Sequence, residues 1–585
     1  MIGISGAIIS RIIAIMSSPR CIIPWGAVPA RGRGCRAWLV SCAASGAAMR
    51  HRAAVIRGSD FMVSSREKCV AFRSLIPLCE DPGMPGKETM IPRMPCATRL
   101  RWEPSEDLTR LEQWIAPRVA ANGGGDPARS AFRLLATGLE AFVARAVLIE
   151  LAERTLDLQY YIFHPDKTGS LIVDRLIAAA DRGVRVRVLL DDWGTLEKKD
   201  ESVAGLDAHP NIEVRLFNPY THRSGLYRFA ELLTSFARVN RRMHNKQFIA
   251  DGIATILGGR NIGDEYFGVG ELDFQDVDVL GAGPIARQST TSFETYWNSQ
   301  FAVPITQLGK FAPDPSFFPA ARTQLRDRCE SLSDSVYGRA LVESHLARDL
   351  RADDLHVHWA AARVIADPPE KLTQPVGARS ETYLGGQLSP YARAARADLL
   401  VVSPYFVPGK AGVEFFGSRR QDGVSVSVLT NSLAATDVWL VHAGYMKYRR
   451  PLLEQGVRLY ELRPEAAGAT RPRASKAVIG SSRASLHGKT FVFDRTSVFI
   501  GSVNLDPRSL DQNTEVGVLV TSAELAGEVA ALFERWSSPE LAYEVKRGAN
   551  GGLQWTGGYT DEPEAGFWRP LGARLFSHLP IDSLI

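Results

Sequence analysis

The 585-residue sequence has few cysteines in the part that reads as folded domains, and it has no long apolar run. Six of its seven cysteines lie within the first 100 residues, and only Cys329 follows. The six form no C-x2-C pair and no histidine pattern accompanies them, so a zinc module is not expected. The apolar opening at residues 1–16 is interrupted by Arg11 and is shorter than the ~20 residues that a membrane-spanning helix needs.

An excess of basic over acidic residues is also lacking beyond the first 100 residues. The formal net charge is +5, but residues 1–100 carry 14 Lys/Arg and 5 Asp/Glu, so the other 485 residues together carry −4. In proteins that bind nucleic acid, clustered basic side chains neutralise the phosphates, and the counterions that this releases into solution increase the affinity. The acidic balance of the main body therefore argues against a nucleic-acid partner and against a nuclease.

Residues 1–100 differ in composition from everything that follows, and they hold seven of the nine methionines. A targeting leader, a cysteine-rich module and an over-extended gene start all fit such a break. We favour the over-extended start, with Met90 or Met94 as the alternative first residue. This leader, 1–100, is expected to be disordered.

A β-α-β pattern occurs twice in the rest of the chain. LDLQYYIF (156–163) is strand-like, the apolar periodicity after it predicts a helix that ends at Gly183, and VRVRVLLDD (184–192) is a second strand. The same order returns at 398–408, 411–420 and 422–431, with a shared Gly-Val-x-Val-x-Val-Leu frame. Such units imply parallel strands and an α/β architecture, and their repetition indicates a duplication.

Each copy of this pattern is followed by a His-x-Lys-x4-Asp motif. The motif residues are His244, Lys246 and Asp251 in the first copy and His487, Lys489 and Asp494 in the second. Matched residues follow at equal offsets: Gly259 and Asn261 in the first copy, Ser502 and Asn504 in the second. A duplication with polar strand residues of no function would also give such a repeat, but intact motifs in both copies favour a catalytic role.

The spacing suits chemistry on a phosphodiester. Residues i and i+2 of a strand share a face, so each His and its Lys emerge together, whereas the Asp has the opposite parity and need not touch substrate. One neutral His can attack phosphorus while the other, protonated, supplies a proton to the leaving oxygen. The Lys and Asn side chains can hold the non-bridging oxygens. This chemistry requires no metal or other cofactor, and no carboxylate cluster for a metal is evident in the sequence.

Each catalytic His needs a hydrogen-bond partner that fixes its tautomer. Asp276 and Glu515 are the candidates, at +32 and +28 from the histidine of their own copy, and Asp278 competes with Asp276. The alternative is that Asp276 and Glu515 are surface carboxylates on a strand that follows each motif and do not contact the histidines. The glycine at 258 or 501 and its neighbour allow close approach of backbone to an anion.

These motifs resemble the phospholipase D superfamily, and more narrowly the bacterial cardiolipin synthases of the type C branch. The resemblance covers roughly residues 105–585 and is carried by NRRMHNKQFIADGIATILGGRNIGDEYFG and SLHGKTFVFDRTSVFIGSVNLDPRSLDQNTEVG. It implies two similar α/β domains, each a mixed β-sheet flanked by helices, related by a pseudo-twofold axis around one shared active site. We place them at 105–308 and 335–545, with a linker at 309–334 and a tail at 546–585.

The resemblance also implies an activity. A phosphatidyl group would pass through a phosphohistidine to phosphatidylglycerol and form cardiolipin, with phosphatidylglycerol or phosphatidylethanolamine as donor. By analogy His244 is the nucleophile and His487 the acid, although the near-symmetry of the motifs leaves the order open. The alternative is hydrolysis of phospholipids to phosphatidic acid, and a lipid-binding scaffold without activity is disfavoured by the two intact motifs.

The remaining expectations concern the membrane and the rim of the site. The tail resembles an interfacial amphipathic segment, which predicts peripheral attachment to the bacterial inner membrane; an ordinary docked helix is the alternative. Strand-end aromatics could line a lipid channel or belong to the core: Tyr160, Tyr161, Tyr405 and Phe406. His442 is a further candidate for facing the substrate.

Overall fold

The computed structural model describes most of the chain beyond the leader. The described residues are 107–122, 129–195, 205–221, 236–268, 272–308, 317–332, 334–352, 354–378, 380–464, 483–566 and 568–577. The leader expected at 1–100 lies outside these residues.

Two halves of similar strand arrangement form the described part. The first-half strands are β1 (Arg129–Leu135), β2 (Thr155–Tyr160), β3 (Arg185–Asp191), β4 (Ile212–Phe217), β5 (Gln247–Ala250), β6 (Ala254–Gly258), β7 (Leu272–Gln275), β8 (Asp278–Ala282) and β9 (Ala302–Pro304). The second-half strands are β10 (His358–Ala366), β11 (Asp398–Val402), β12 (Ser425–Asn431), β13 (Arg458–Leu462), β14 (Arg483–Leu486), β15 (Thr490–Phe493), β16 (Ser497–Gly501), β17 (Val516–Thr521), β18 (Ala542–Arg547) and β19 (Leu553–Trp555).

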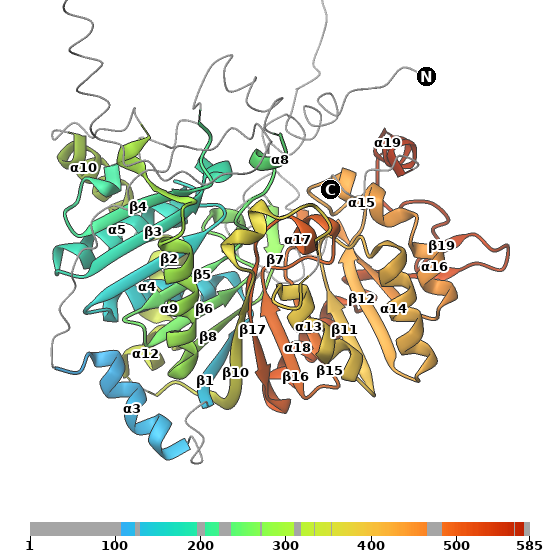
Figure 1. The fold of residues 1–585 in the computed structure, drawn as a ribbon, viewed down its shortest axis with the longest axis horizontal. Helices are drawn as coiled ribbons and strands as arrows, with labels where there is room; N and C mark the ends of the chain where they lie inside the picture. Colours follow the sequence, from blue (N-terminus) through green and yellow to red (C-terminus); the bar gives the residue numbers. More distant parts are fainter. Residues whose placement is uncertain are drawn as a thin grey trace, which may run out of the picture. The chain divides into compact units, whose positions relative to one another are not determined.

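All but β7 and β14 join one mixed sheet that runs through both halves. Its order is β9-β4-β3-β2-β5-β6-β8-β1-β10-β17-β16-β15-β11-β12-β13-β18-β19. The parallel triplets β2-β3-β4 and β11-β12-β13 confirm the two predicted β-α-β units. Because the order reads alike outward from the antiparallel β1–β10 pair, the halves are related as the duplication predicts (Figure 1).

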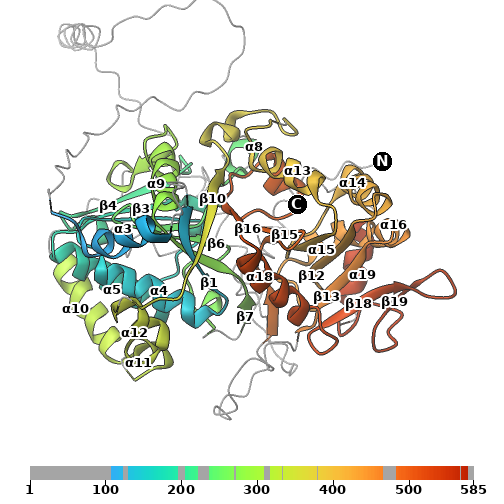
Figure 2. The same ribbon diagram turned by 90° about the horizontal axis from the view of Figure 1, so that it is seen from below.

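Helices cover the sheet. In the first half they are α3 (Arg110–Asn122), α4 (Gly138–Leu151), α5 (Lys167–Asp181), α8 (Phe236–Val239), α9 (Pro284–Trp297), α10 (Phe317–Glu330), α11 (Val336–Glu343) and α12 (His345–Ala352). In the second they are α13 (Leu384–Ala394), α14 (Gly409–Gln421), α15 (Trp439–Met446), α16 (Arg449–Glu454), α17 (Pro507–Asp511), α18 (Ala523–Trp536) and α19 (Trp568–Ser577), with short 3-10 turns such as η2 (Asp264–Tyr266) between elements. Figure 2 shows α9 and α18 near the central strands of their halves.

Local sequence signals account for these helix limits. Thr137 and Glu140 form a capping box at the start of α4, and Asp166 caps α5 through the amide of Gly169. The crossover helices α5 and α14 are each followed by a glycine in the left-handed region, Gly183 at φ +96° and Gly423 at φ +87°. That conformation costs glycine little, so both helices end at the same point of the repeat.

The segment expected as a linker, 309–334, contains helix α10, which packs against α5. Helices α11 and α12 follow, and Tyr337, Leu341 and Leu346 join the apolar core that also holds α4. Packing of the first half therefore continues to about residue 352, beyond the boundary expected at 334. The prolines before α10 suggested an open connection, but the apolar residues of α11 pack against α4 of the first half.

Candidate active site

Backbone pairing between the halves brings the two motifs to one place. Strand β14, just before His487, runs parallel to β7, just before Asp276. The amide N–H groups of His487 and Gly488 both donate to the carbonyl oxygen of Gln275, at 2.8 and 2.9 Å. On the other motif, the amide of His244 donates to the carbonyl oxygen of Thr514 at 2.8 Å. Each histidine is thus held by main chain from the opposite half.

The carboxylate partners of the histidines are exchanged between the halves. His244 Nδ1 lies 2.9 Å from Glu515 Oε2, and His487 Nδ1 lies 2.5 Å from Asp276 Oδ2. We expected each carboxylate beside the histidine of its own copy, and that pairing is wrong. The spacing of residues along the sequence does not predict how the two halves pack against each other. Because Nδ1 is engaged on both rings, Nε2 is the nitrogen left for chemistry.

Glu515 is buried and contacts both His244 and Ser502. Besides His244, it accepts a hydrogen bond from the Ser502 hydroxyl at 2.5 Å, and His244 Nδ1 also lies 3.1 Å from the Ser502 carbonyl oxygen. Burial raises the pKa of Glu515 to about 7, against the opposing attraction of Lys246. Ser502, matched in sequence to Gly259, therefore supports the carboxylate.

Asp276 has a different environment. Burial disfavours its charge, but contact with His487 and the charge of Lys489 outweigh burial and lower the pKa of Asp276 below its usual value. A Cβ added at Gly259 would collide with this carboxylate. The shorter Asp side chain requires glycine there, whereas the longer Glu515 leaves room for the serine. The site is pseudo-symmetric, and its two carboxylates differ in charge behaviour.

The lysines turn back towards their own histidines. Lys246 Nζ donates to the His244 carbonyl oxygen at 2.7 Å, and Lys489 Nζ makes the same contact to His487. Burial lowers the pKa of Lys246 well below its usual value and that of Lys489 to about 8, although neighbouring carboxylates oppose the shift. Two buried ammonium groups this close would be stabilised by an anion bound between the halves.

Both imidazoles are held neutral by their surroundings. Burial lowers the pKa of each ring, and the adjacent lysines lower it further, for His244 as for His487. With Nδ1 tied to a carboxylate, a neutral ring presents an Nε2 lone pair. Such a ring is suited to attack on phosphorus, and an incoming phosphate anion favours protonation of the second ring.

The motif aspartates lie at the other end of strands β5 and β15. Asp251 accepts the amide N–H groups of Glu153, Arg154 and Thr155 at 2.8–3.3 Å. Asp494 accepts the three equivalent amides, Arg396, Ala397 and Asp398, at 2.7–3.0 Å. We expected these two aspartates among the catalytic residues. Their contacts with backbone amides instead indicate a structural role, in agreement with their opposite strand parity.

The two asparagines are buried next to the site but are used differently. Asn261 Oδ1 accepts the backbone N–H of Ile162 at 3.1 Å. Asn504, only 3% exposed, has an Oδ1 with no hydrogen-bond partner among the described residues. The first asparagine fixes the end of β2, and the second retains a polar atom that substrate can engage.

Comparison with known proteins agrees with this geometry. The family model described as "Cardiolipin synthase, PLD-like domain" matches residues 146–297 and 390–536. Cardiolipin synthase C from Escherichia coli (strain K12) is 39% identical over 498 residues, which span 82% of this chain and 100% of that protein. The chain belongs to the cardiolipin synthase family of the phospholipase D superfamily. It is accordingly an enzyme.

More distant relatives of this family also match. Cardiolipin synthase A from Pseudomonas syringae pv. syringae (strain B728a) is 24% identical over 443 residues, covering 74% of this chain and 75% of that protein. The crystal structure of phosphatidylserine synthase from Haemophilus influenzae Rd KW20 aligns with a TM-score of 0.51 at 13% identity, over 80% of this chain and 99% of that one. That structure supports the shared fold.

Several aromatic and acidic neighbours of the histidines were not singled out from this cardiolipin synthase family sequence. The rings of Tyr266 and Phe274 lie 5.2 and 4.9 Å from the His487 ring, and the buried Asp506 and the more exposed Asp437 both interact electrostatically with Lys489. Burial raises the pKa of Asp506 to about 7. When Asn261 is matched with Asn504, Tyr266 falls opposite Ser509 and Asp506 opposite Gly263, so the repeat gave no signal for these two.

The aromatic candidates divide between site and core. The Tyr161 ring lies 5.1 Å from that of His244, and the Tyr405 hydroxyl donates to Asp437 at 2.8 Å. Tyr160, by contrast, is buried against Arg145, and Phe406 packs in the second-half core. Asp278, the competitor of Asp276, pairs with Arg145 at 2.9 Å and does not contact a motif histidine.

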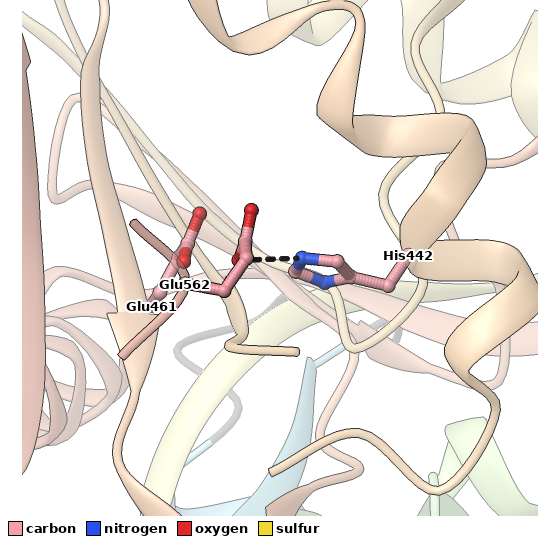
Figure 3. A group of neighbouring side chains, drawn as sticks. All are labelled: His442, Glu461 and Glu562. Carbon is pink, nitrogen blue, oxygen red and sulfur yellow. Dashed lines mark ion pairs between the residues drawn. The ribbon is translucent and has the colours of Figure 1, made fainter. Parts of the chain in front are cut away.

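His442 belongs to a buried charge cluster and not to the catalytic pair. Its ring points at Glu562, 3.7 Å away, with Glu461 beside them (Figure 3). Three such groups resemble a metal site, but the Arg449 guanidinium already bonds all of them, at 2.6 Å to His442, 2.7 Å to Glu461 and 2.5 Å to Glu562. A cation therefore already occupies the position that a metal ion would take.

Proposed function

We propose that the protein is a phosphatidyltransferase that forms cardiolipin from phosphatidylglycerol and a second glycerophospholipid. The observation that carries this proposal is the pair of neutral, largely buried histidines, each fixed through Nδ1 by a carboxylate of the opposite half and each beside a buried lysine. The 39% identity to cardiolipin synthase C over that protein's full length supports the choice of lipid substrates.

His244 is proposed as the nucleophile. Its Nε2 attacks the donor phosphorus, the bond from phosphorus to the leaving alcohol oxygen breaks, and that oxygen takes a proton from His487. In the second step His487 removes the proton from the acceptor hydroxyl, the new phosphorus–oxygen bond forms and His244 is released. Asp276 supports this order, because a carboxylate with a lowered pKa at 2.5 Å stabilises the protonated form of His487.

The lysines and Asn504 are proposed to bind the phosphoryl oxygens. Lys246 and Lys489 are buried and point into the same site from the two halves, and charge on the phosphorane would be stabilised by both. All these groups are supplied by side chains, so the proposed reaction needs no metal ion.

Attachment to the bacterial inner membrane is proposed to involve helix α19. No helix within the described residues is long and apolar enough to cross a bilayer. Trp568, Leu571 and Leu575, spaced along one face of α19, are 77, 53 and 68% exposed, while Ala573 on another face is fully buried. Figure 1 places α19 beyond α15, on the side of the molecule that also carries α17. The exposed apolar face and the neighbouring Arg569 suit a peripheral contact with anionic lipid.

The test is a lipid-product assay. Purified protein beginning at Met90 is incubated with labelled phosphatidylglycerol in mixed micelles, with and without phosphatidylethanolamine, in the presence of EDTA. Cardiolipin is expected, and the dependence on phosphatidylethanolamine identifies the donor. The variants His244→Ala and His487→Ala should each form no cardiolipin.

Phosphatidic acid as the sole product would replace this proposal with the hydrolytic alternative. Cardiolipin formation that required a divalent ion, or that persisted in both histidine variants, would contradict the mechanism. Asn240→Ala, a change outside the motif, is a matched control that should retain transfer.

A further inference from the structure

Equivalent positions of the two halves can be counted from their shared contacts. The amide of Asp251 donates to the Thr155 carbonyl oxygen, and that of Asp494 to Asp398, so β2 and β11 start at equivalent residues. Counting back through α4 and α13 matches Phe142 with Gly385 and Arg145 with Leu388. Matching the motif asparagines places Arg260 opposite Val503, one residue before them, and Phe267 opposite Leu510, six residues after them.

In the first half these positions hold large side chains that fill the space under α4. The rings of Phe142 and Phe267 meet edge to face with centroids 5.7 Å apart. Arg145 donates to Asp278 at 2.9 Å, and Arg260 donates to the Leu135 carbonyl oxygen at 3.1 Å. All four large residues are at most 2% exposed, so this half is closed at that point.

In the second half the same positions hold small or apolar residues, and a cavity of about 580 Å³ takes the place of the large side chains. It lies between α13, α14, α17 and the strands β11 and β15. Its apolar lining includes Leu388, Leu399, Val401, Phe416, Phe491, Phe493, Val503 and Leu510. Ligand pockets usually measure about 300–1,000 Å³ and are mostly apolar with a few polar groups, as this one is.

The charged groups of the cavity are mainly basic. Arg393 and Lys410 line it, and within the described residues neither has a carboxylate at ion-pair distance. Arg393 Nε donates to the Ser389 hydroxyl at 3.1 Å, which holds the guanidinium at the cavity. Asp511 also lines the cavity, so the lining carries a net charge of +1. An apolar interior with unneutralised basic groups suits a ligand that has an apolar body and an anionic head.

The cavity lies directly behind a segment of the active site. Along residues 502–507, Ser502, Asn504 and Asp506 are the buried polar residues of the site, while Val503, Leu505 and Pro507 line the cavity. This alternation is that of an extended chain with two faces. A ligand in the cavity would therefore contact the back of the segment that carries Asn504.

We propose that this cavity binds one fatty acid, with its hydrocarbon chain among the apolar residues and its carboxylate at Arg393 and Lys410. One methylene needs roughly the ~30 Å³ that a water molecule occupies in the liquid, so 580 Å³ holds about one long chain and not the two of a diacyl lipid. The inference does not depend on the proposed transfer activity, because binding is measured without turnover.

The experiment measures binding of octanoate, decanoate and dodecanoate to the full chain by isothermal titration calorimetry, below their micellar concentrations. Each buried methylene should raise affinity about fourfold, and one molecule should bind per chain. Gly385→Phe restores the ring that Phe142 supplies in the first half, and it should weaken dodecanoate binding at least tenfold. Ala392→Phe fills the same cavity from elsewhere on α13, and Val336→Phe on the exposed side of α11 is the control.

The head group is tested separately with dodecanol and the double variant Arg393→Gln/Lys410→Gln. This variant should weaken dodecanoate and leave dodecanol unchanged. Unchanged dodecanoate binding in both cavity-filling variants, with melting temperatures equal to the parent, would overturn the proposal. So would affinity that does not rise with chain length, or equal loss of binding in Val336→Phe.

Discussion

At the scale of single residues, the two carboxylates that support the histidines differ in ionisation. Glu515 is protonated over a wide range because burial raises its pKa to about 7, whereas the lowered pKa of Asp276 keeps that group ionised. The catalytic step should therefore respond to pH through Glu515 on the acidic side and through Lys489, with its pKa lowered to about 8, on the alkaline side.

The pH dependence of cardiolipin formation tests this assignment. Ionised Glu515 stabilises positive charge on His244, so kcat/KM should rise as pH passes about 7 and fall above about 8 as Lys489 loses its proton. Glu515→Gln keeps a hydrogen-bond acceptor without the charge. It should reduce kcat/KM by about 10²–10³ and remove the acidic limb. An acidic limb that persists in this variant would assign it to another group.

The motif aspartates give a second prediction at this scale. Asp251→Asn retains one oxygen for the three amides at and just before the start of β2, and it tolerates the left-handed backbone, φ +53°. We expect a loss of about 1–3 kcal/mol in the free energy of unfolding, with specific activity preserved in the folded fraction. Calorimetry and the product assay measure the two effects. The comparison is Lys246→Ala, which should abolish activity; loss of activity in folded Asp251→Asn would return this residue to the catalytic group.

The sequence predicted most of this residue set because the repeat marks it twice. The histidines His244 and His487 occupy matched positions in the repeat. Strand parity predicted that the motif aspartates would point away from them. The exchange of Asp276 and Glu515 could not be predicted, since it depends on how two halves pack. Asp437 was missed because its electrostatic interaction with Lys489 joins residues that are far apart in the sequence.

At the scale of elements, the β-α-β units were predictable from alternation and from the glycines that end α5 and α14. The helices α10 to α12 were not. The packing of α11 depends on contacts between residues far apart in sequence, such as that between the rings of Tyr337 and Phe142, whose centroids are 5.0 Å apart. The polar, proline-containing segment 309–334 was interpreted as a linker, although it contains α10, which packs against α5.

Also at the scale of elements, we predict that helix α19 attaches the protein to the membrane. Replacing Trp568, Leu571 and Leu575 together by serine removes the exposed apolar face and leaves Ala573 and Phe576, which contact the body of the protein. Binding to phosphatidylglycerol-containing vesicles should fall at least tenfold in a sedimentation assay, because each side chain that inserts contributes about 1.5–3 kcal/mol when fully buried. Val342→Ser, at a 73% exposed residue of α11, is the control. Equal vesicle binding of the triple variant would exclude α19 as the attachment element.

At the scale of the molecule, duplication has produced one site from two similar halves. The sheet is continuous through the β1–β10 pair, and each half supplies a histidine, a lysine and the carboxylate for the other half's histidine. Neither half contains a complete catalytic set. The proposed division of roles between the two motifs rests on the remaining differences between the halves, such as Glu515 against Asp276.

The most direct test of this account uses a phosphatidyl donor whose leaving group is p-nitrophenolate, which departs without a proton. In His487→Ala, His244 should still attack, but acceptor activation fails. One p-nitrophenolate should then be released per chain, with the phosphatidyl group retained on His244 in mass spectra of the quenched protein. His244→Ala should give neither burst nor adduct. An adduct on His487, or steady turnover without any adduct, would contradict the proposed division of roles between the two halves.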